Sequence, residues 1–572
     1  MMNSNKMSFR KFNSILFAFI FLALGQHVSA RGDQELVLSG SWVYDSLNYI
    51  CLEQKIVNFA DSTPLTISQI KTLMNEVDYN SLSDAGRGHF NKLIQYFKEE
   101  AVTFNSDLIY FGLEPEVALE SYYKSNSNID WVYDRYQRNS LIESPFVFGS
   151  GDLFTVKMDL ALRQNKGMAY HNDNYSNVPL AQDQIDIHFP KYGYLATEKK
   201  ISDSSGIAFK FGIFDRNIGR TDTGSCIMSE YLTGCTNAQL EIYSPDYKYT
   251  LSATQFNVDK YYYQHQLDFR LFKKFTFTIL EGLLVNAPME LRYLNPLIIY
   301  HGYAPWRDYD TKDDETHTGS LMGLKAQFVP FSGLRFYGLF AMTQFQTSFE
   351  LENFPNDVTP NGMCGQLGAE FVRPFRDGYL RFALEGYYAE PYMYIKESPD
   401  WTFVRTYQDN IGDYEIFYEW IGSPFGPDTI SGELSAGYNV PDKYSLDLIY
   451  LFMARGEMSG TAVFDSIADY WGGTNINDGF YDSDNRGQWC YPDKGEKGQG
   501  FTEAKRRQGL VTPTGTPEYV NRISARLNYK FNKKLSVTVQ PSFVFVFNTN
   551  HEEDKFNSGF EAAIAAKYRF IR

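Results

Sequence analysis

From about residue 104 to the C-terminus, hydrophobic and polar side chains alternate in short runs. In residues 522–531, Ile523, Leu527 and Tyr529 alternate with polar residues such as Arg526. A period of two is typical of a β-strand whose two faces meet different surroundings. Many runs reach roughly 9–11 residues, the length with which a tilted strand crosses a membrane. Similar runs cover residues 153–162, 207–214, 266–272, 321–329, 334–345, 379–388, 444–452, 535–547 and 561–571.

Alternation alone fits two architectures, tandem soluble β-domains and a transmembrane barrel. In a soluble sandwich the apolar face forms a core, whereas in a barrel the apolar face meets lipid and the polar face lines the lumen. Three observations favour the barrel: the lengths of the strands, the unbroken strand-rich region, and the export signal at residues 1–30 that is described below. We therefore expect a mostly β protein, in which residues 103–572 form an antiparallel transmembrane β-barrel. The available length predicts an even number of strands, about 16–18.

Residues 31–102 show a helical period instead, which predicts a small helical unit in front of the barrel. An i, i+4, i+7, i+8 apolar stripe begins at Val43. Thr66 and Gln69 have the spacing of a capping box, which opens a helix. A third helix is expected near residues 84–100. A unit of roughly sixty residues is marginally stable alone, so we expect it to pack against the barrel.

Residues 1–30 are typical of a secretory signal peptide. Lys6, Arg10 and Lys11 form a basic start, residues 15–24 are an apolar run, and small residues suited to cleavage follow. The apolar run is too short to span a bilayer as a helix, and no other run approaches the roughly 20 apolar residues that a membrane helix needs. The sequence thus predicts an exported chain and excludes a helical membrane protein.

Composition narrows the class of partner. The formal net charge is −16, and an acidic chain argues against nucleic acid as a partner. Aromatic residues make up 17% of the chain, which fits the aromatic girdles of a membrane barrel. The five cysteines form no disulfide framework for a chain of this length. Because the sequence has no CxxC pair and no HExxH motif, it has no zinc-site pattern. The acidic segment at residues 482–487 begins like a calcium loop, but Arg486 stands where an oxygen ligand is needed, so we interpret it as a solvated turn and expect no metal and no cofactor.

Residues 215–235 read DRNIGRTDTGSCIMSEYLTGC, and their glycines, arginines, serines and cysteines make this segment a candidate for a phosphate-binding loop or a disulfide-closed loop. A phosphate-binding loop has the form GxxxxGK[ST] and opens a helix. Here Gly219 and Gly224 are followed by Ser225 rather than Lys, and a strand pattern comes next. We interpret the segment as a polar turn between barrel strands, not as a nucleotide loop.

The same segment holds two cysteines and several polar candidates. Cys226 and Cys235 lie nine positions apart in an exported chain, so a loop disulfide and two free thiols are both open. Residues that we expect to orient the lumen or the helical unit are Arg216, Arg220, Ser225 and Ser229.

His301 is the candidate for catalysis. It could act as a general base with Asp308 or Asp310, but no pattern ties a serine or cysteine nucleophile to it. An ordinary hydrogen bond at a strand end is the competing interpretation. We expect a protein without enzymatic activity.

Aromatic residues in the expected loops point to carbohydrate. Tryptophans lie among Asp, Asn and Arg residues, and their rings stack on sugar faces while the charged groups bind hydroxyls. Anchoring in the aromatic belt of a membrane is the other interpretation. The tryptophans concerned are Trp306, Trp401, Trp471 and Trp489.

Three short segments resemble the capsule-assembly Wzi-like outer-membrane proteins. Residues 42–47 (WVYDSL) are similar to the helical start of that family. Gly219, Gly224-Ser225 and Ser229 match an internal motif of the family, although Ile218 replaces its aromatic residue and Arg220-Thr221 replaces its Pro-Gly. The third segment comprises Asn295, Pro296, Leu297, Tyr300 and His301.

The resemblance implies a barrel of about 18 strands with a periplasmic helical bundle, in the outer membrane of a diderm bacterium. It implies a non-catalytic, lectin-like protein, which we expect to be a monomer in contact with outer-membrane lipid and surface polysaccharide. A diffusion porin, favoured by lumen-facing Arg and Lys residues, and a membrane hydrolase using His301 are the alternatives. The expected ligand-binding residues are Arg216, Arg220, Ser225, Ser229, Asn295, His301, Trp306, Trp471 and Trp489.

Overall fold

The computed structural model of the chain describes residues 32–98, 102–105, 109–129, 138–150, 153–165, 175–186, 188, 190–302, 318–353, 361–396, 402–408, 416–458 and 509–570. No helix within these ranges is long and apolar enough to cross a membrane.

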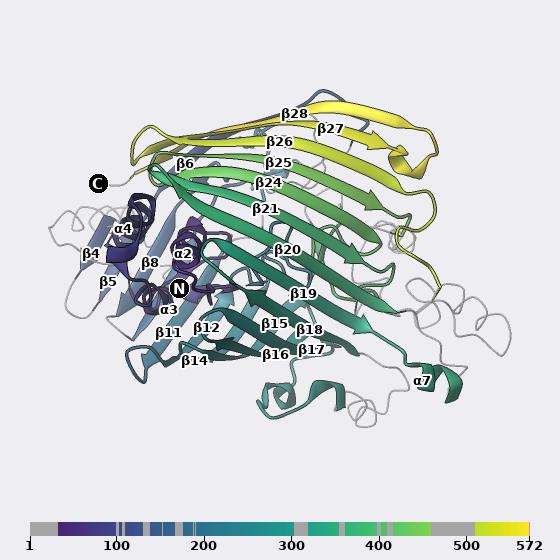
Figure 1. Ribbon diagram of the computed structural model, residues 1–572, viewed down its shortest axis with the longest axis horizontal. Helices are drawn as coiled ribbons and strands as arrows, with labels where there is room; N and C mark the ends of the chain where they lie inside the picture. Colours follow the sequence, from purple (N-terminus) through teal and green to yellow (C-terminus); the bar gives the residue numbers. More distant parts are fainter. Residues whose placement is uncertain are drawn as a thin grey trace, which may run out of the picture.

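The fold is dominated by one large antiparallel sheet (Figure 1), whose hydrogen-bonded order contains 22 strand segments in the described residues. These segments are β4 Val102–Asn105, β5 Tyr110–Leu113, β6 Glu116–Lys124, β7 Ile142–Glu143, β8 Pro145–Ser150, β9 Phe154–Asp159, β10 Tyr175–Ser176, β11 Gly193–Lys200, β12 Gly206–Ile213, β14 Thr236–Tyr243, β15 Tyr247–Asn257, β16 Lys260–Leu271, β17 Phe275–Asn286, β18 Thr318–Phe328, β19 Leu334–Gln344, β20 Gly362–Phe375, β21 Gly378–Ala389, β24 Thr429–Val440, β25 Tyr444–Arg455, β26 Glu518–Lys530, β27 Leu535–Phe547 and β28 Phe556–Arg569.

The sheet closes into a barrel, because its last strand pairs with one of its first. β28 is hydrogen-bonded to β6, and the ladder continues through β5–β8, β8–β9 and β9–β11. β5 and β6 are consecutive segments of one pass of the chain through the wall, and β7 and β8 are consecutive segments of the next pass. β6 pairs with β7, and β5 pairs with β8. If each of these two pairs is taken as one span, and the short β4 and β10 are left out, the described ring has eighteen spans. The predicted antiparallel barrel of about 16–18 strands is confirmed.

The two faces of the barrel have the polarity expected in lipid. On β21, Arg381 and Glu385 point inward and are buried, whereas Phe382, Leu384 and Tyr388 point outward and are exposed. A soluble β-domain has the opposite arrangement, with apolar side chains buried. The exposure of these side chains therefore favours a transmembrane barrel over tandem soluble β-domains, a choice that the alternation in the sequence left open.

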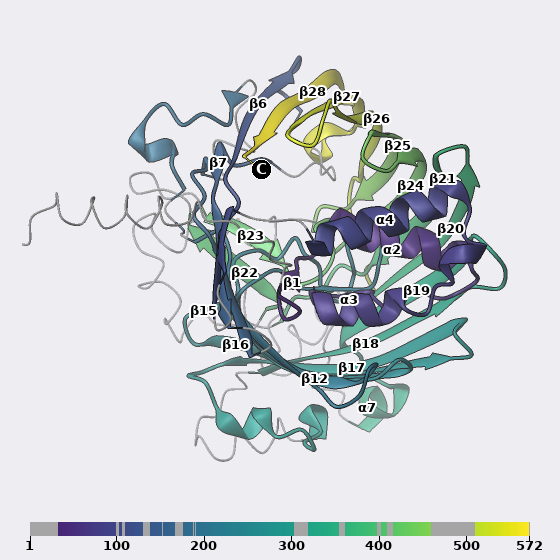
Figure 2. The same cartoon turned by 90° about the vertical axis from the view of Figure 1, so that its left-hand side faces the viewer.

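In the part of the chain that the structure describes, three α-helices precede the barrel: α2 Trp42–Glu53, α3 Ile67–Met74 and α4 Asp84–Lys98. α3 begins with the predicted capping box, in which Thr66 and Gln69 cap each other's backbone. Apolar residues of all three helices form one buried cluster. Figure 2 shows these helices inside the ring of strands, where α2 contacts β20 and α4 contacts β21.

The two ends of the barrel differ. At the end where the helices lie, here called the helical end, consecutive strands are joined by short turns such as residues 272–274, 441–443 and 531–534. At the opposite end, here called the loop end, most connections are long, including residues 287–317, 345–361 and 456–517. The barrel is therefore asymmetric along its axis.

The described parts of two connections from the loop end fold into the lumen. The first, residues 214–235, contains β13 Asn217–Ile218, which pairs with β2 Ser62–Thr63 of the helical unit. We call it the plug. The second, residues 390–428, contains the hairpin of β22 Val404–Gln408 and β23 Ile416–Trp420. The interpretation of residues 215–235 as a simple polar turn is thus too limited, because residues 222–229 are all buried.

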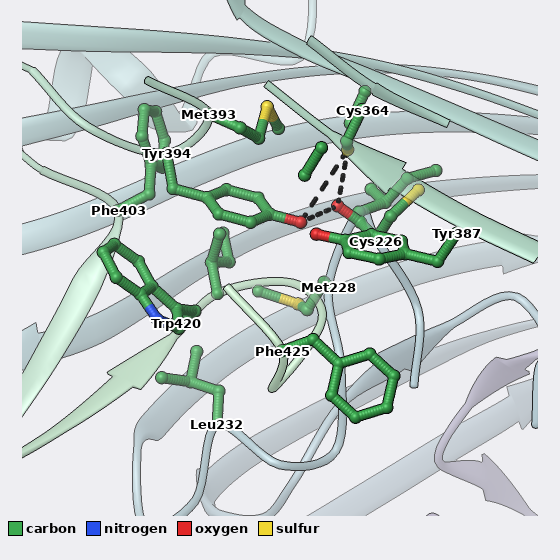
Figure 3. Close-up of a cluster of buried hydrophobic side chains, with 14 of the residues drawn as sticks. Cys226, Met228, Leu232, Cys364, Tyr387, Met393, Tyr394, Phe403, Trp420 and Phe425 are labelled. Atoms are coloured by element: carbon green, nitrogen blue, oxygen red, sulfur yellow. Dashed lines mark hydrogen bonds between the residues drawn. The ribbon is translucent and has the colours of Figure 1, made fainter. Parts of the chain in front are cut away.

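An apolar cluster fills the lumen around these two segments. Ile227, Met228 and Leu232 of the plug pack with Phe403, Trp420 and Phe425 of the second segment and with wall residues of both sides of the barrel. Figure 3 shows part of this cluster. We call it the apolar layer.

Candidate functional site in the barrel lumen

One carboxylate of the barrel wall makes several hydrogen bonds to the plug. Glu385 on β21 accepts hydrogen bonds from the backbone N–H groups of Asp222 and Thr223, at 2.7 and 2.9 Å. It also accepts from the side chains of Gln366, at 2.8 Å, and Tyr337, at 2.5 Å. Glu385 thus joins the backbone of the plug to side chains of β19 and β20, and these hydrogen bonds hold the plug in position.

Two glycines allow the plug to follow its path. Gly219 and Gly224 have φ angles of 99° and 92°, in the left-handed region that glycine adopts most readily. A Cβ atom at Gly224 would lie 2.8 Å from the Pro424 ring, and one at Gly219 would lie 2.6 Å from the Leu339 side chain. Backbone conformation and space both account for these glycines, which the family resemblance had singled out.

A charged network lies beside the plug. Glu370, which is fully buried, accepts from Arg335 at 2.9 Å and from Arg381 at 2.6 Å. Arg381 also donates to Asp222 of the plug at 2.6 Å. Because a buried charge is costly unless it is paired, each member of this network depends on the others.

Arg220 joins this network to the helical unit. Its guanidinium lies 2.8 Å from Asp45 on α2 and 3.8 Å from Glu370. Asn48, one turn further along α2, donates to Glu370 at 3.1 Å. Helix, plug and wall are therefore connected through charged hydrogen bonds at one place.

A cavity of about 490 Å³ opens next to this junction. We call it the vestibule. It lies between α2, the plug and the inner face of β24–β27, and Gly40 at its edge is exposed to solvent. Its lining is largely polar and includes Asp45, Arg220, Glu230, Tyr231, Asp447 and Arg526.

Among the acids that line the vestibule, Glu230 has a raised pKa. Burial raises the pKa of its carboxyl to about 7; Asp215 and Asp45 add to the shift, and Arg220 opposes it. Desolvation and nearby negative charge both disfavour a carboxylate.

The other predicted residues of the plug make buried hydrogen bonds to the wall, within the plug and to the second inserted segment. Arg216 is buried and donates to Thr254 and Gln264 of the wall, both at 3.2 Å. The Ser225 hydroxyl donates to the Ile218 carbonyl at 2.5 Å, and the backbone N–H of Ser229 donates to Ile421 at 2.8 Å. Of the four plug residues predicted to orient the lumen, only Arg220 lines the vestibule.

Cys226 and Cys235 are free, buried thiols, so of the two alternatives the structure has no disulfide between them. The Cys226 carbonyl accepts from the Tyr394 hydroxyl at 2.6 Å and from the Cys364 thiol at 3.6 Å (Figure 3). Both cysteines belong to the apolar layer.

Asn295 and His301 lie far from this junction in the fold, in the connection between β17 and β18 at the loop end. Both are exposed, and the backbone N–H of His301 donates to Glu281 at 2.6 Å. Trp306, Trp401, Trp471 and Trp489, and also Asp308 and Asp310, lie outside the described residues. The predicted site residues therefore do not form one group.

Sequence reasoning missed the wall residues of the site. Arg335, Glu370, Arg381 and Glu385 stand at lumen-facing positions of three neighbouring strands. Charged residues on the polar face of predicted strands were the available signal, but the sequence does not state which of them meet across the lumen. Among the described residues, no group of three His, Cys, Asp or Glu side chains is suited to hold a metal ion.

The fold is similar to that of a solved outer-membrane protein. Wzi of Escherichia coli, which is involved in group 1 capsule assembly and is described as a carbohydrate-binding β-barrel, matches with a TM-score of 0.55. The alignment covers 94% of this chain and 100% of Wzi at 11% sequence identity. The resemblance to Wzi-like proteins is confirmed for the fold: the chain has the β-barrel fold of this outer-membrane protein.

Two further solved structures show weaker similarity. OprD of Pseudomonas aeruginosa matches with a TM-score of 0.36 and 11% identity, over 80% of this chain and 95% of OprD. The channel DcaP of Acinetobacter baumannii matches with a TM-score of 0.34 and 9% identity, over 82% of this chain and 99% of DcaP. These TM-scores are too low for any argument about function. No protein-family model matches the sequence, and no curated protein matches it.

Proposed function

We propose that this barrel binds exported or capsular polysaccharide at the cell surface and holds it there without catalysis. The observation that supports this most strongly is the apolar layer, which packs plug residues such as Ile227 and Leu232 against both sides of the wall. Water and small solutes do not cross a close-packed apolar core readily. A closed barrel suits a binding and anchoring role better than diffusion. The carbohydrate binding described for Wzi, which has the same fold, points in the same direction.

The helical end faces the periplasm in this proposal. Outer-membrane barrels have short periplasmic turns and longer extracellular loops. The helical end has the short turns, and the loop end has the long connections. Surface polysaccharide would thus meet the loop end, and the helical unit would lie at the periplasmic mouth.

The proposal includes no enzymatic step. His301 is exposed, and the interaction of its backbone with Glu281 serves to hold the connection against the outer wall. Hydrolysis of polysaccharide by the purified protein that is lost in His301→Ala would overturn this part of the proposal in favour of the hydrolase alternative.

A pair of measurements tests the proposal against the porin alternative. Planar bilayers that contain the purified protein are expected to show no stable channel steps, because the lumen is closed. Cells that lack the protein are expected to lose polysaccharide from their surface into the medium, while the total amount made is unchanged. Stable porin-like conductance together with unchanged surface polysaccharide would overturn the proposal in favour of a diffusion channel.

A further inference from the structure

The vestibule has the dimensions of a ligand site. Its volume of about 490 Å³ lies within the range of roughly 300–1,000 Å³ that is usual for small-molecule pockets. The geometry points to a binding site for a short stretch of glycan in the vestibule, reached from the helical end. This inference rests on the proposed function, because it takes exported polysaccharide as the ligand. It adds a second contact with that ligand, on the opposite side of the apolar layer from the cell surface.

The plug side of the vestibule presents a held donor. Arg220 is fixed between Asp45, at 2.8 Å, and the more distant Glu370, at 3.8 Å. The neighbouring Arg381 is held by Glu370 and by Asp222, each at 2.6 Å. Side chains that are ordered before binding lose little conformational entropy when a ligand arrives, which favours affinity.

The wall side places an acceptor beside a donor. Asp447 on β25 is directly opposite Arg526 on β26, and both line the vestibule. Asn528, two residues beyond Arg526 on the same inner face, adds an amide that both donates and accepts. Neighbouring hydroxyls of a sugar ring need this combination, because each hydroxyl donates one hydrogen bond and accepts others.

The vestibule is lined by both acidic and basic side chains, which favours a neutral ligand over a highly charged one. A polyanion entering the vestibule would meet Asp45, Glu230 and Asp447, and a polycation would meet Arg220 and Arg526. Like charges at a partly desolvated site are costly. A neutral polyhydroxyl chain finds a hydrogen-bonding partner on either kind of group. The ring of Tyr231 at the same cavity offers an apolar face for the CH groups of a sugar.

Direct binding measurements on the full-length protein in detergent test this assignment. The probe is the host's own exported polysaccharide, cut by partial acid hydrolysis into neutral fragments of a few sugars, and affinity is read by calorimetry. Asn528→Trp fills the vestibule and is expected to weaken binding at least tenfold. Leu527→Trp, on the lipid-facing side of the same strand, is the matched control and is expected to leave the affinity within about twofold of the unaltered protein.

A conservative variant covers the case in which the added ring prevents folding. Asp447→Asn keeps the size of the side chain and removes its charge, and it is expected to weaken binding about fivefold. Resistance of the folded barrel to unheated SDS checks that each variant has folded.

The outcomes separate the two proposals. If the unaltered protein binds the fragments and both vestibule variants bind equally well, the site lies elsewhere and this inference is overturned, while the proposed function stands. If the unaltered protein binds no fragment, both fail. Weakened binding in the folded vestibule variants, with the control unchanged, supports the vestibule as the site.

Discussion

The apolar layer and the vestibule lie in one lumen and share the same strands. On the inner face of β26, the side chains change from Val520 near the loop end to Arg526 and Asn528 near the helical end. On β27, the change runs from Val546 near the loop end to Thr538 near the helical end. The outer face of β27 stays apolar throughout, and that of β26 is apolar except for Asn521.

This difference shows how one barrel is filled by apolar side chains at one level and keeps a cavity lined by polar side chains at another. At the level of Val520, the plug and the second inserted segment supply apolar partners, so the lumen is packed like the core of a soluble protein. At the level of Asn528 there is no such partner among the described residues, and polar side chains line a cavity. Closure of the lumen therefore depends on the apolar side chains that the inserted segments supply. Substitutions in the apolar layer and at the polar level are expected to have different effects.

The largest effect is expected from removing the apolar part of the plug. Replacing residues 226–232 with a Gly-Ser linker of equal length takes Ile227, Met228 and Leu232 out of the apolar layer. We expect planar-bilayer recordings to change from no channel steps to stable open-channel conductance. The matched control is the same kind of linker at residues 201–205, a turn at the helical end, and it should stay silent. A folded plug variant that does not conduct would mean that other segments close the lumen.

The next effect concerns the polar junction. Glu370→Leu leaves Arg335 and Arg381 buried without their shared carboxylate. The loss of one partner of a buried ion pair costs about 3–5 kcal/mol, so we expect a large drop in the unfolding midpoint in detergent. Leu367→Ala, at an exposed outward position of the same strand, is the control and should change the midpoint little. Equal midpoints for the two variants would show that the network contributes no net stability.

The sequence predicted the strands, the helices and the barrel because these depend on local patterns. The period of two along β26 and the capping box at Thr66 are readable within a few residues. The filling of the lumen is different, because it depends on contacts between distant parts of the chain. Arg220 meets Asp45, and Glu385 meets the plug, across more than a hundred residues in each case.

The same reason explains the mixed outcome for the candidate site. Arg220, Ser225 and Ser229 were marked by a resemblance, which identifies a segment but not the direction of each side chain. Only the fold separates Arg220, which lines the vestibule, from Ser225 and Ser229, which are buried within the plug. Asn295 and His301 belong to a connection on the outer side of the wall, which no local pattern reveals.

A smaller effect is expected within the apolar layer. Ile227 is fully buried in the plug, and Ile227→Ala creates a cavity that costs about 2–4 kcal/mol. The control is Ile523→Ala, which removes an outward-facing side chain from β26 and should cost clearly less. Thermal unfolding in detergent measures both. If the two substitutions cost the same, the layer is loosely packed, and its role in closing the lumen would need another explanation.

The smallest effect concerns the acid of the vestibule. The pKa of Glu230 is about 7 in the folded protein against 4.5 ordinarily, so the unfolded chain releases this proton more readily. Between these two pH values the folded state binds more protons, and stability therefore falls as the pH rises from about 4.5 to about 7. Glu230→Gln removes this contribution. We expect the variant to gain in unfolding midpoint over the unaltered protein as the pH rises through this window, and to keep a constant gain above it. Glu553→Gln, at an exposed position in the turn before β28, should follow the unaltered protein at every pH. If the difference in unfolding midpoint between Glu230→Gln and the unaltered protein is the same at every pH, Glu230 ionises in the vestibule as it would at an ordinary surface. The vestibule would then differ from the apolar layer in shape but not in its effect on a charged group.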